Sequence, residues 1–401
     1  MTESRIQNHG SEPRNGGIFY MISQERRAHL QQAVTDLTER YRKAGYFPSA
    51  CVRVFDDRET LAVVCAGEAR EHSLFDVASL TKIATATQIL RLISAGRLGL
   101  DTALGTIFPE AEEEDILRER LSKISIRQLL THTSGIVDWY PFYSRKGEAF
   151  WQVMAYALAH TEPVSGMVYS DLNFMILGKV IERLQGKNLD RCLQENLVAP
   201  LGLGRMMYCP PADADIIPSS YGNPIEERMC RERGIAFDGF RSREEAVRGE
   251  VNDGNCHYYF RGVCGLAGIF AEAEAYERLC RYYMHTGDPL LIEAQREQPG
   301  APSRGLGFQT GASYPHGCGH TGFTGTGIWF SREYRIGAVS MTNRLFYREA
   351  NPNATGDFRR TLHEIAFALA GADYKGGSGT PRVELRNIHS YKKAPVSAIS
   401  P

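Results

Sequence analysis

Residues 75–90 read FDVASLTKIATATQIL, in which a Ser-x-x-Lys pattern opens a run of regularly spaced apolar side chains. The apolar side chains recur at the intervals of an amphipathic helix: Leu80, Ile83, Ala84, Ile89, Leu90 and Ile93. We expect a helix from about Ser79 to Ala95 that stops at Gly96, because glycine often ends helices. Ser79 then lies on the first turn, and Lys82 lies on the same face.

The pair Ser79 and Lys82 has the chemistry of an activated nucleophile. A serine hydroxyl is a weak nucleophile at neutral pH and needs a base within hydrogen-bond reach. A partly desolvated lysine can be that base, and a helix N-terminus stabilises negative charge that develops nearby. The pattern alone is common, and residues 390–393 repeat it in the C-terminal tail. No apolar helix would hold that copy, so Ser79 is the preferred candidate.

Strands are expected on both sides of this helix, towards the two ends of the chain. They are runs rich in β-forming residues: Ser49–Phe55, Thr60–Cys65, Gly307–Thr310, Gly325–Ser331 and Arg335–Asn343. Helical patterns at Ser23–Ala44 and Phe358–Ala370 flank them, and the region from about 100 to 285 is mostly helical. The sequence therefore predicts a mixed α/β (α+β) fold with one antiparallel sheet built from both chain ends.

This pattern divides the chain into a sheet domain and an inserted domain. We expect residues 23–98 and 286–375 to form the sheet domain, and 99–285 to form a mostly helical insertion. A catalytic cleft would lie between the two, and the charged loop from about Pro210 to Asp253 would form part of its wall. Residues 1–22 are predicted to be a loosely attached leader, and 376–401 a flexible tail.

Composition excludes several classes of partner. The chain has 401 residues, and its 46 basic and 47 acidic side chains give a formal net charge of −1. The sequence has no block of basic residues that would bind a phosphate backbone, so no nucleic-acid partner is expected. No stretch reaches the roughly 18 apolar residues that a membrane span needs. The first 17 residues are polar and lack the core of a secretory signal, which favours a cytoplasmic location.

The cysteines and histidines do not indicate a metal site. The nine cysteines are scattered and form no Cys-x-x-Cys, which predicts reduced, mostly buried thiols. His316, Cys318 and His320 form an H-x-C-x-H cluster, but its glycine-rich setting lacks the spacing of two-histidine helical motifs. No second ligand pair follows, so we expect neither a metal nor a cofactor. His132 is interpreted as a histidine of a turn or of the core.

Two further patterns accompany Ser79. Tyr169-Ser170-Asp171 precedes an apolar helical run, and a tyrosine beside a lysine can act as a shared general base. The similar pattern at 221–223 lies in the charged loop with no helix after it, so Tyr169 is preferred. His320-Thr321-Gly322 leads through small residues into an apolar strand, where a substrate can approach the backbone closely. The copy at 285–287 ends a helical stretch and is set aside.

The order and spacing of the three patterns resemble those of a known family. Tyr169 follows Ser79 by 90 residues, and His320 follows Tyr169 by 151. The set resembles the serine β-lactamase and penicillin-binding-protein superfamily, closest to the class C β-lactamases and the related esterases and DD-peptidases. The resemblance covers about residues 25–370 and includes further stretches at 129–135, 169–178, 249–255, 262–268 and 342–344.

The resemblance implies a role for each of these residues. Ser79 would attack a carbonyl and form an acyl-enzyme, with Lys82 as its activating base. Tyr169 would carry the proton between the nucleophile, the lysine and the leaving group. The backbone N–H groups of Ser79 and Phe323 would form the oxyanion hole. Whether lysine or tyrosine takes the first proton is left open.

Two positions depart from the family pattern. Asp171 stands where the second motif usually has Asn, and an anion there would pair with Lys82 and hold the pKa of that amine up. Asn173 is a possible stand-in, although on a helix it would face away from Asp171. His320 stands where the third motif usually has Lys, and a largely neutral histidine would not supply a permanent cation for a substrate carboxylate.

Three functions remain open. The leading hypothesis is a serine hydrolase that cleaves a small-molecule ester, amide or peptide through acyl-Ser79. The second is a DD-carboxypeptidase, penicillin-binding protein or weak β-lactamase. The third is a catalytically silent binding protein on the same scaffold, which the replacements at Asp171 and His320 keep open.

Overall fold

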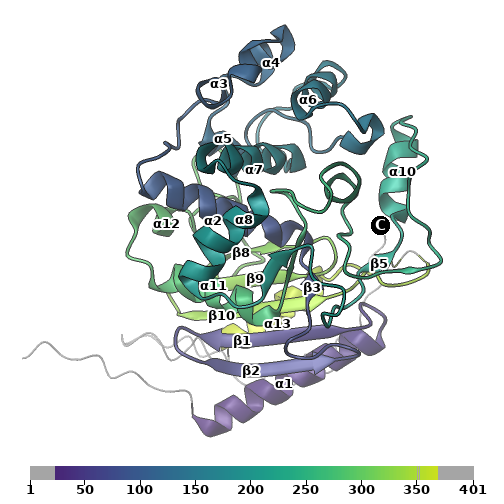
Figure 1. Ribbon diagram of the computed structural model, residues 1–401. Coiled ribbons are helices and arrows are strands. Elements are labelled where there is room, and N and C mark those ends of the chain that lie inside the picture. The colour runs from purple at the N-terminus through teal and green to yellow at the C-terminus, as the bar shows by residue number, and fades with distance from the viewer. Residues whose placement is uncertain (1–22, 350, 352, 369–401) are drawn as a thin grey trace, which may run out of the picture.

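A five-stranded antiparallel sheet joins segments from the two ends of the chain in this computed structural model (Figure 1). The structure describes residues 23–349, 351 and 353–368. From one edge to the other the strands are β2 (Thr60–Ala66), β1 (Ala50–Asp56), β10 (Ile336–Thr342), β9 (Gly327–Ser331) and β8 (Cys318–Thr321). This order confirms the predicted sheet. The predicted leader and tail lie outside the described residues.

Helices cover both faces of the sheet because both sets of alternating side chains are apolar. Val52 and Val54 pack on one face with residues of the first and last helices, and Cys51 and Phe55 face the larger core on the other side. The helices against the sheet are α1 (Gln24–Lys43) and α13 (Gly356–Ala366) on the first face and α11 (Ala273–His285) on the second.

The chain between the two groups of strands is mostly helical, as predicted. The short 3₁₀ turn η1 (Ala78–Leu80) leads directly into α2 (Thr81–Ser94), which crosses the larger core. The other α-helices there are α3 (Leu104–Ile107), α4 (Asp115–Arg120), α5 (Ile126–Leu130), α6 (Phe150–Ala159), α7 (Asp171–Gln185), α8 (Leu189–Leu193), α9 (Ala199–Leu201), α10 (Pro224–Glu232) and α12 (Pro289–Glu293). Shorter helical turns are η2 (Pro109–Glu112), η3 (Phe142–Arg145), η4 (Gln194–Val198) and η5 (Asn255–Tyr259).

One predicted strand is wrong. Residues 307–310 form no strand, and only Gln309 makes single bridges, to Gly319 of β8 and to Arg304. Gly307 has a φ of 88°, which breaks the extended conformation. The segment therefore runs as a loop beside the edge of the sheet.

Short strands that the sequence does not reveal build two small sheets. One contains β3 (Phe75–Asp76), β7 (Ile269–Ala271) and β4 (Met206–Tyr208). The other pairs β5 (Ser220–Tyr221) with β6 (Ala246–Val247) inside the segment predicted as a charged loop, which also contains α10. Strands of two or three residues are too short to show a period of two, so the pattern had no signal for them.

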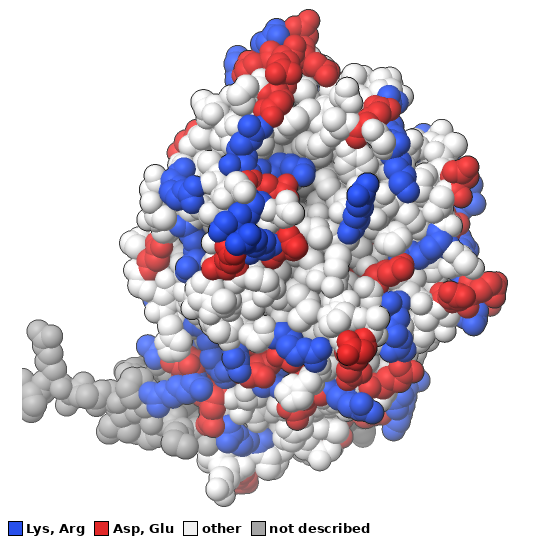
Figure 2. Space-filling model, in the orientation of Figure 1, with Lys and Arg blue, Asp and Glu red and all other residues white. Residues whose placement is uncertain are grey.

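Charge on the visible face is mixed. Figure 2 shows Lys and Arg interspersed with Asp and Glu, with acidic side chains gathered at the top over α4. Among the described residues, no helix combines the length and the apolar character needed to cross a bilayer. Seven of the nine cysteines are buried, where they pack as small apolar side chains.

A buried ion pair fastens α11 to the sheet. The Glu277 side chain is fully buried, and its carboxylate lies 2.5 Å from Nε of Arg53 on β1. It also accepts a hydrogen bond from Thr60 Oγ1 at 2.6 Å. We expect Glu277→Ala to lower the free energy of unfolding by about 3–5 kcal/mol, because it removes the buried partner of both Arg53 and Arg281 and leaves Arg53 only the exposed Glu71 at 3.7 Å.

Urea denaturation followed by circular dichroism measures this loss. The matched control is Glu274→Ala on the same helix, because Glu274 pairs with Arg278 near the surface, where ion pairs contribute under about 1 kcal/mol. Equal losses in the two variants would show that the buried pair does not hold α11 to the sheet.

Candidate active site

Ser79 and Lys82 meet at the junction of η1 and α2. Lys82 Nζ donates a hydrogen bond to Ser79 Oγ at 2.9 Å. The Lys82 side chain is fully buried, whereas Ser79 is partly exposed. The helical spacing of three residues therefore places an amine directly against a hydroxyl that a ligand can reach.

The backbone just before Ser79 is held in an unusual conformation. Ala78 has a φ of 47°, a region that non-glycine residues seldom adopt. The buried Asp76 carboxylate stabilises it by accepting hydrogen bonds from the N–H groups of Ala78 at 2.9 Å and Asn252 at 2.6 Å. Burial raises the pKa of Asp76 to about 6, although these two hydrogen bonds oppose the rise. Sequence reasoning missed Asp76, because Asn252 is brought to it only by the fold.

Lys82 is surrounded by three acceptors. Besides Ser79, its Nζ donates to the carbonyl of Leu266 at 3.2 Å and lies 2.8 Å from Asp171 Oδ1. Burial opposes the charged amine, but the Asp171 carboxylate and the Tyr169 phenol outweigh burial and raise the pKa of Lys82. Lys82 is thus an ammonium that donates hydrogen bonds to Ser79 Oγ and to the Leu266 carbonyl and forms an ion pair with Asp171. The sequence-based expectation that an anion at 171 would hold this pKa up agrees with the ion pair.

Tyr169 lies beside Lys82 at the start of α7. The ring centroid of Tyr169 is 5.1 Å from Lys82 Nζ and 4.6 Å from the ring centroid of His132. His132 is buried, and its Nδ1 accepts a hydrogen bond from the N–H of Ser170 at 3.0 Å. His132 therefore fixes the backbone next to Tyr169, a more specific position than the turn or core role interpreted from the sequence.

Asn173 does not replace Asp171 at the lysine. Its Oδ1 accepts a hydrogen bond from Ser134 Oγ at 2.7 Å, and no contact with Lys82 is made. The angular argument from helix geometry explains this, since residues two apart on a helix face nearly opposite directions.

The turn between β8 and β9 packs on the residues that precede Ser79. Thr324 Oγ1 donates to the Asp76 carbonyl at 2.8 Å, and Thr326 Oγ1 donates to the Val77 carbonyl at 3.0 Å. Gly322 is required there, because a Cβ at this position would lie 2.5 Å from the Val77 carbonyl oxygen. The N–H of Phe323 in this turn donates no hydrogen bond to the described residues. The amide is therefore available to a bound oxygen.

His320 is neutral in this site. Its side chain is 1% exposed, and Nδ1 lies 2.8 Å from the Thr321 carbonyl oxygen. Burial, together with the nearby cations Arg304 and Lys82, lowers the pKa of His320 well below its usual range. Nε2 is buried and has no partner among the described residues. His320 thus presents a polar ring, and not a cation, where the family pattern has lysine.

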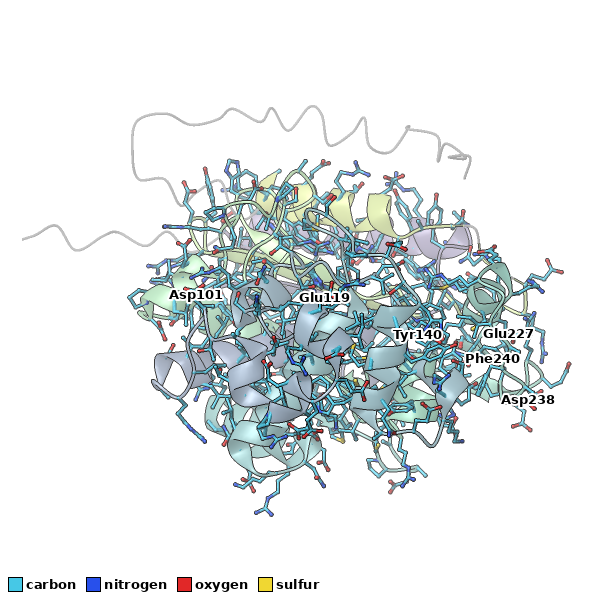
Figure 3. The ribbon with its side chains drawn as sticks, turned by 90° about the horizontal axis from the view of Figure 1, so that it is seen from above. Asp101, Glu119, Tyr140, Glu227, Asp238 and Phe240 are labelled. Carbon is cyan, nitrogen blue, oxygen red and sulfur yellow. The ribbon has the colours of Figure 1, made fainter. Side chains whose placement is uncertain are left out.

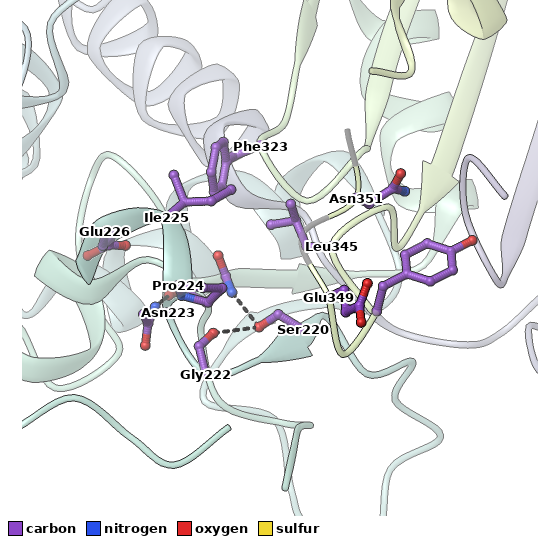
Figure 4. A pocket seen from close by; sticks show the side chains of 12 residues that line it. Ser220, Gly222, Asn223, Pro224, Ile225, Glu226, Phe323, Leu345, Glu349 and Asn351 are labelled. Carbon is purple, nitrogen blue, oxygen red and sulfur yellow. Dashed lines mark hydrogen bonds between the residues drawn. The ribbon is translucent and has the colours of Figure 1, made fainter. Parts of the chain in front are cut away.

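A small hollow of about 40 Å³ opens beside Phe323 (Figure 4). Figure 4 shows Ile225, Phe323 and Leu345 pointing towards one another across it. Phe323 is 41% exposed, and Asn252 and Asn223 add amides to the lining. The wall on one side is α10 with its flanking residues, and Figure 3 places Glu227, Asp238 and Phe240 together at this edge of the molecule.

The comparison with protein families fits this geometry. A sequence profile described as Beta-lactamase matches residues 31–360, which is most of the chain. The chain belongs to the Beta-lactamase family. This confirms the resemblance drawn from the three motifs.

The relatives of this Beta-lactamase family protein carry names that describe different activities. It is similar to the N-acetylmuramyl-L-alanine amidase of Bacillus subtilis (strain 168), with 27% identity over 371 residues, 80% of this chain and 83% of the relative. Among solved structures it resembles EstCE1, a hydrolase with promiscuous acyltransferase activity, with a TM-score of 0.64 and 17% identity over 85% of this chain and 99% of the other. It also resembles a class C β-lactamase in complex with cefoxitin, with a TM-score of 0.63 and 18% identity over 85% of this chain and 99% of the other. The two structural likenesses establish the fold.

The histidines and the cysteine of the H-x-C-x-H pattern do not gather at one place in this Beta-lactamase family protein. Cys318 and His320 are buried on β8, and the ring of His316 packs on Tyr334. Among the described residues, no three His, Cys, Asp or Glu side chains come together as metal ligands would.

Proposed function

We propose that this protein hydrolyses esters or amides of small molecules through an acyl-Ser79 intermediate. Membership of the Beta-lactamase family supports a hydrolase. The observation that carries the proposal is the 2.9 Å hydrogen bond between Lys82 Nζ and Ser79 Oγ, with the Tyr169 ring beside the same amine. A hydroxyl in contact with a buried ammonium is poised to become a nucleophile, because the cation stabilises the charge that develops on its oxygen.

In the proposed reaction, Ser79 Oγ forms a bond to the substrate carbonyl carbon. The negative charge moves to the carbonyl oxygen, which accepts hydrogen bonds from the amides of Ser79 and Phe323. When the tetrahedral intermediate collapses, the bond to the leaving group breaks and the leaving group takes a proton. Water then attacks the ester on Ser79, releases the acid and restores the serine.

The first proton is assigned to Tyr169 and not to Lys82. Lys82 donates to Ser79 Oγ and to the Leu266 carbonyl, and its ion pair with Asp171 favours the charged amine. A resting ammonium has no lone pair to accept a proton. The hydroxyl proton of Ser79 is therefore assigned to Tyr169, whose ring lies 5.1 Å from Lys82 Nζ. In this step a phenolate oxygen of Tyr169 takes the proton and becomes a phenol. Tyr169 then returns a proton to the leaving group.

This assignment predicts the pH profile of the Asp171→Asn variant. Asp171 raises the pKa of Lys82, so removing its charge lowers that pKa. Activity that requires the ammonium form is lost as pH rises through the pKa of Lys82. We therefore expect the alkaline limb of the kcat/KM profile to move to lower pH in Asp171→Asn. A shift of the acidic limb instead would show that neutral Lys82 is the base.

Covalent labelling tests the proposal. A fluorophosphonate probe is expected to add one adduct mass to the peptide that contains Ser79, because the probe reacts with activated serines. Ser390 of the tail repeat provides an internal control and is expected to stay unlabelled. An intact protein without adduct, after prolonged exposure to the probe, would favour the silent binding scaffold and overturn the proposal.

Cell-wall peptides or β-lactams form a second candidate substrate class. The Bacillus subtilis relative is named an amidase of muramyl-L-alanine, and the class C structure holds cefoxitin. Labelling of Ser79 by a fluorescent penicillin distinguishes this class from general esters. For esters or amides of small molecules, the leading substrate class, we also propose a cytoplasmic location of the protein. Cell fractionation tests this location.

A further inference from the structure

Two cysteines of the five-stranded sheet face each other across neighbouring strands. Cys51 on β1 lies directly opposite Cys65 on β2 in the antiparallel register. Their sulfur atoms are 3.4 Å apart, in hydrogen-bond contact, and both residues are free thiols. The fold thus brings together two nucleophilic groups that the site at Ser79 does not use.

The backbone at this pair already has the spacing that a disulfide needs. Directly opposite residues of antiparallel strands have Cα atoms about 4.5–5.5 Å apart. Disulfides join residues whose Cα atoms are about 4.4–6.8 Å apart. The sulfur atoms of Cys51 and Cys65 can therefore close from 3.4 Å to a bond of about 2.0 Å by rotation of the two side chains, with the strands in place.

The two thiols differ in their access to solvent. Cys65 is exposed on β2, which is the edge strand of the sheet (Figure 1). Cys51 is 1% exposed and packs in the larger core. A reagent in solution consequently reaches the sulfur of Cys65 first, and Cys51 can react only with what is attached to Cys65.

The surroundings favour a thiolate on the exposed member of the pair. The hydrogen bond between the two thiols lowers the pKa of Cys65 and raises the pKa of Cys51, and burial raises the pKa of Cys51 further. The Arg53 cation also lowers the pKa of Cys65, although burial and the Glu71 carboxylate oppose this. Because the thiolate is the nucleophile in thiol–disulfide exchange, Cys65 is the attacking group and Cys51 the resolving group.

We propose that Cys65 and Cys51 are a redox-sensitive pair that a small-molecule disulfide, such as oxidised glutathione, converts into a cross-strand disulfide. The new bond ties the edge strand β2 to β1. Two sulfur atoms in contact, one exposed and one buried, carry this assignment. It is independent of the chemistry proposed for Ser79.

The reaction takes two exchange steps. In the first, the Cys65 thiolate attacks one sulfur of oxidised glutathione, the S–S bond of that molecule breaks, and one glutathione leaves as a thiolate. Cys65 then carries the other glutathione as a mixed disulfide. In the second step, the departed thiolate takes the proton of Cys51, the Cys51 sulfur bonds to Sγ of Cys65, and the second glutathione leaves. The two cysteines lose two electrons, which reduce oxidised glutathione to two thiols.

Peptide mass spectrometry after incubation with oxidised glutathione tests the proposal. We expect the native protein to yield a peptide pair joined through Cys51 and Cys65, lighter by two hydrogen atoms than the separate peptides, with only traces of glutathione on Cys65. Dithiothreitol is expected to restore both thiols.

Two variants separate the steps. In Cys51→Ala the second step cannot occur, so Cys65 is expected to retain glutathione. In Cys65→Ala the buried Cys51 is expected to stay a free thiol, because the reagent cannot reach it.

Cys209 is the internal control. It is also exposed, but its sulfur contacts the carbonyl oxygen of Arg261 at 3.9 Å. We expect Cys209 to retain glutathione in the native protein and in both variants, which shows that the reagent was active in every sample.

Two results would overturn the proposal. In the first, Cys65 of the native protein keeps its glutathione as it does in Cys51→Ala, which shows that the pair does not close. In the second, Cys51 and Cys65 both remain free thiols while Cys209 is modified. Neither result bears on the proposed hydrolase, because the measurement does not involve turnover at Ser79.

Discussion

The Ser79→Ala variant is expected to lose at least about 1,000-fold in kcat/KM for an activated ester, while remaining folded. The reason is that the proposed acyl-enzyme forms on Ser79 Oγ, and alanine leaves no hydroxyl at that position to be acylated. The residual rate would come from the oxyanion site and substrate binding alone. Initial rates with p-nitrophenyl butyrate, measured with both proteins at equal concentration, give the ratio.

Ser390→Ala is the matched control for this experiment. Ser390 begins the second S-x-x-K pattern of the sequence, and its replacement is expected to leave ester hydrolysis unchanged. If Ser79→Ala retained native activity, catalysis would have to be assigned to another group, and the site described above would not be the active site.

The Lys82→Met variant is expected to lose about 100- to 10,000-fold in kcat, the range for removing a group that moves or stabilises a proton. Methionine keeps most of the side-chain length but removes the ammonium group that contacts Ser79 Oγ at 2.9 Å. The Asp171 carboxylate then loses its partner at 2.8 Å, but it is 21% exposed and can be hydrated. Circular dichroism and the melting temperature show whether the variant is folded.

Lys179→Met on α7 provides the comparison for the lysine. Lys179 pairs with Glu182 at 2.8 Å and is 35% exposed, so its loss is expected to change neither kcat nor stability appreciably. Similar activity in Lys82→Met and Lys179→Met would contradict the role of the buried ammonium.

The sequence predicts those parts of the site that are close along the chain or governed by a simple charge rule. Ser79 and Lys82 meet because three residues make almost one helical turn. The pairing of Lys82 with Asp171 followed once the two motifs were assigned to one cleft, since an anion and a buried cation attract. The antiparallel sheet followed from apolar alternation at both ends of the chain.

Other parts of the site depend on contacts that no local pattern encodes. Asp76 reads as one polar residue in an apolar run, and its role appears only when Asn252 is packed beside it. Arg304 precedes residues 307–310, which were predicted as a strand, but Gly307 with its φ of 88° turns the chain there into a loop. The guanidinium consequently faces Tyr169, which is 135 residues earlier in the sequence.

Mass spectrometry of the protein during turnover tests the central claim most directly. A slowly hydrolysed ester is mixed with the native protein, quenched in acid within the first turnovers, and the digest is analysed. We predict that the peptide containing Ser79 gains the mass of the acyl group and loses it as the substrate is consumed. Steady hydrolysis with no acyl adduct on that peptide, or with the adduct on another residue, would contradict the account.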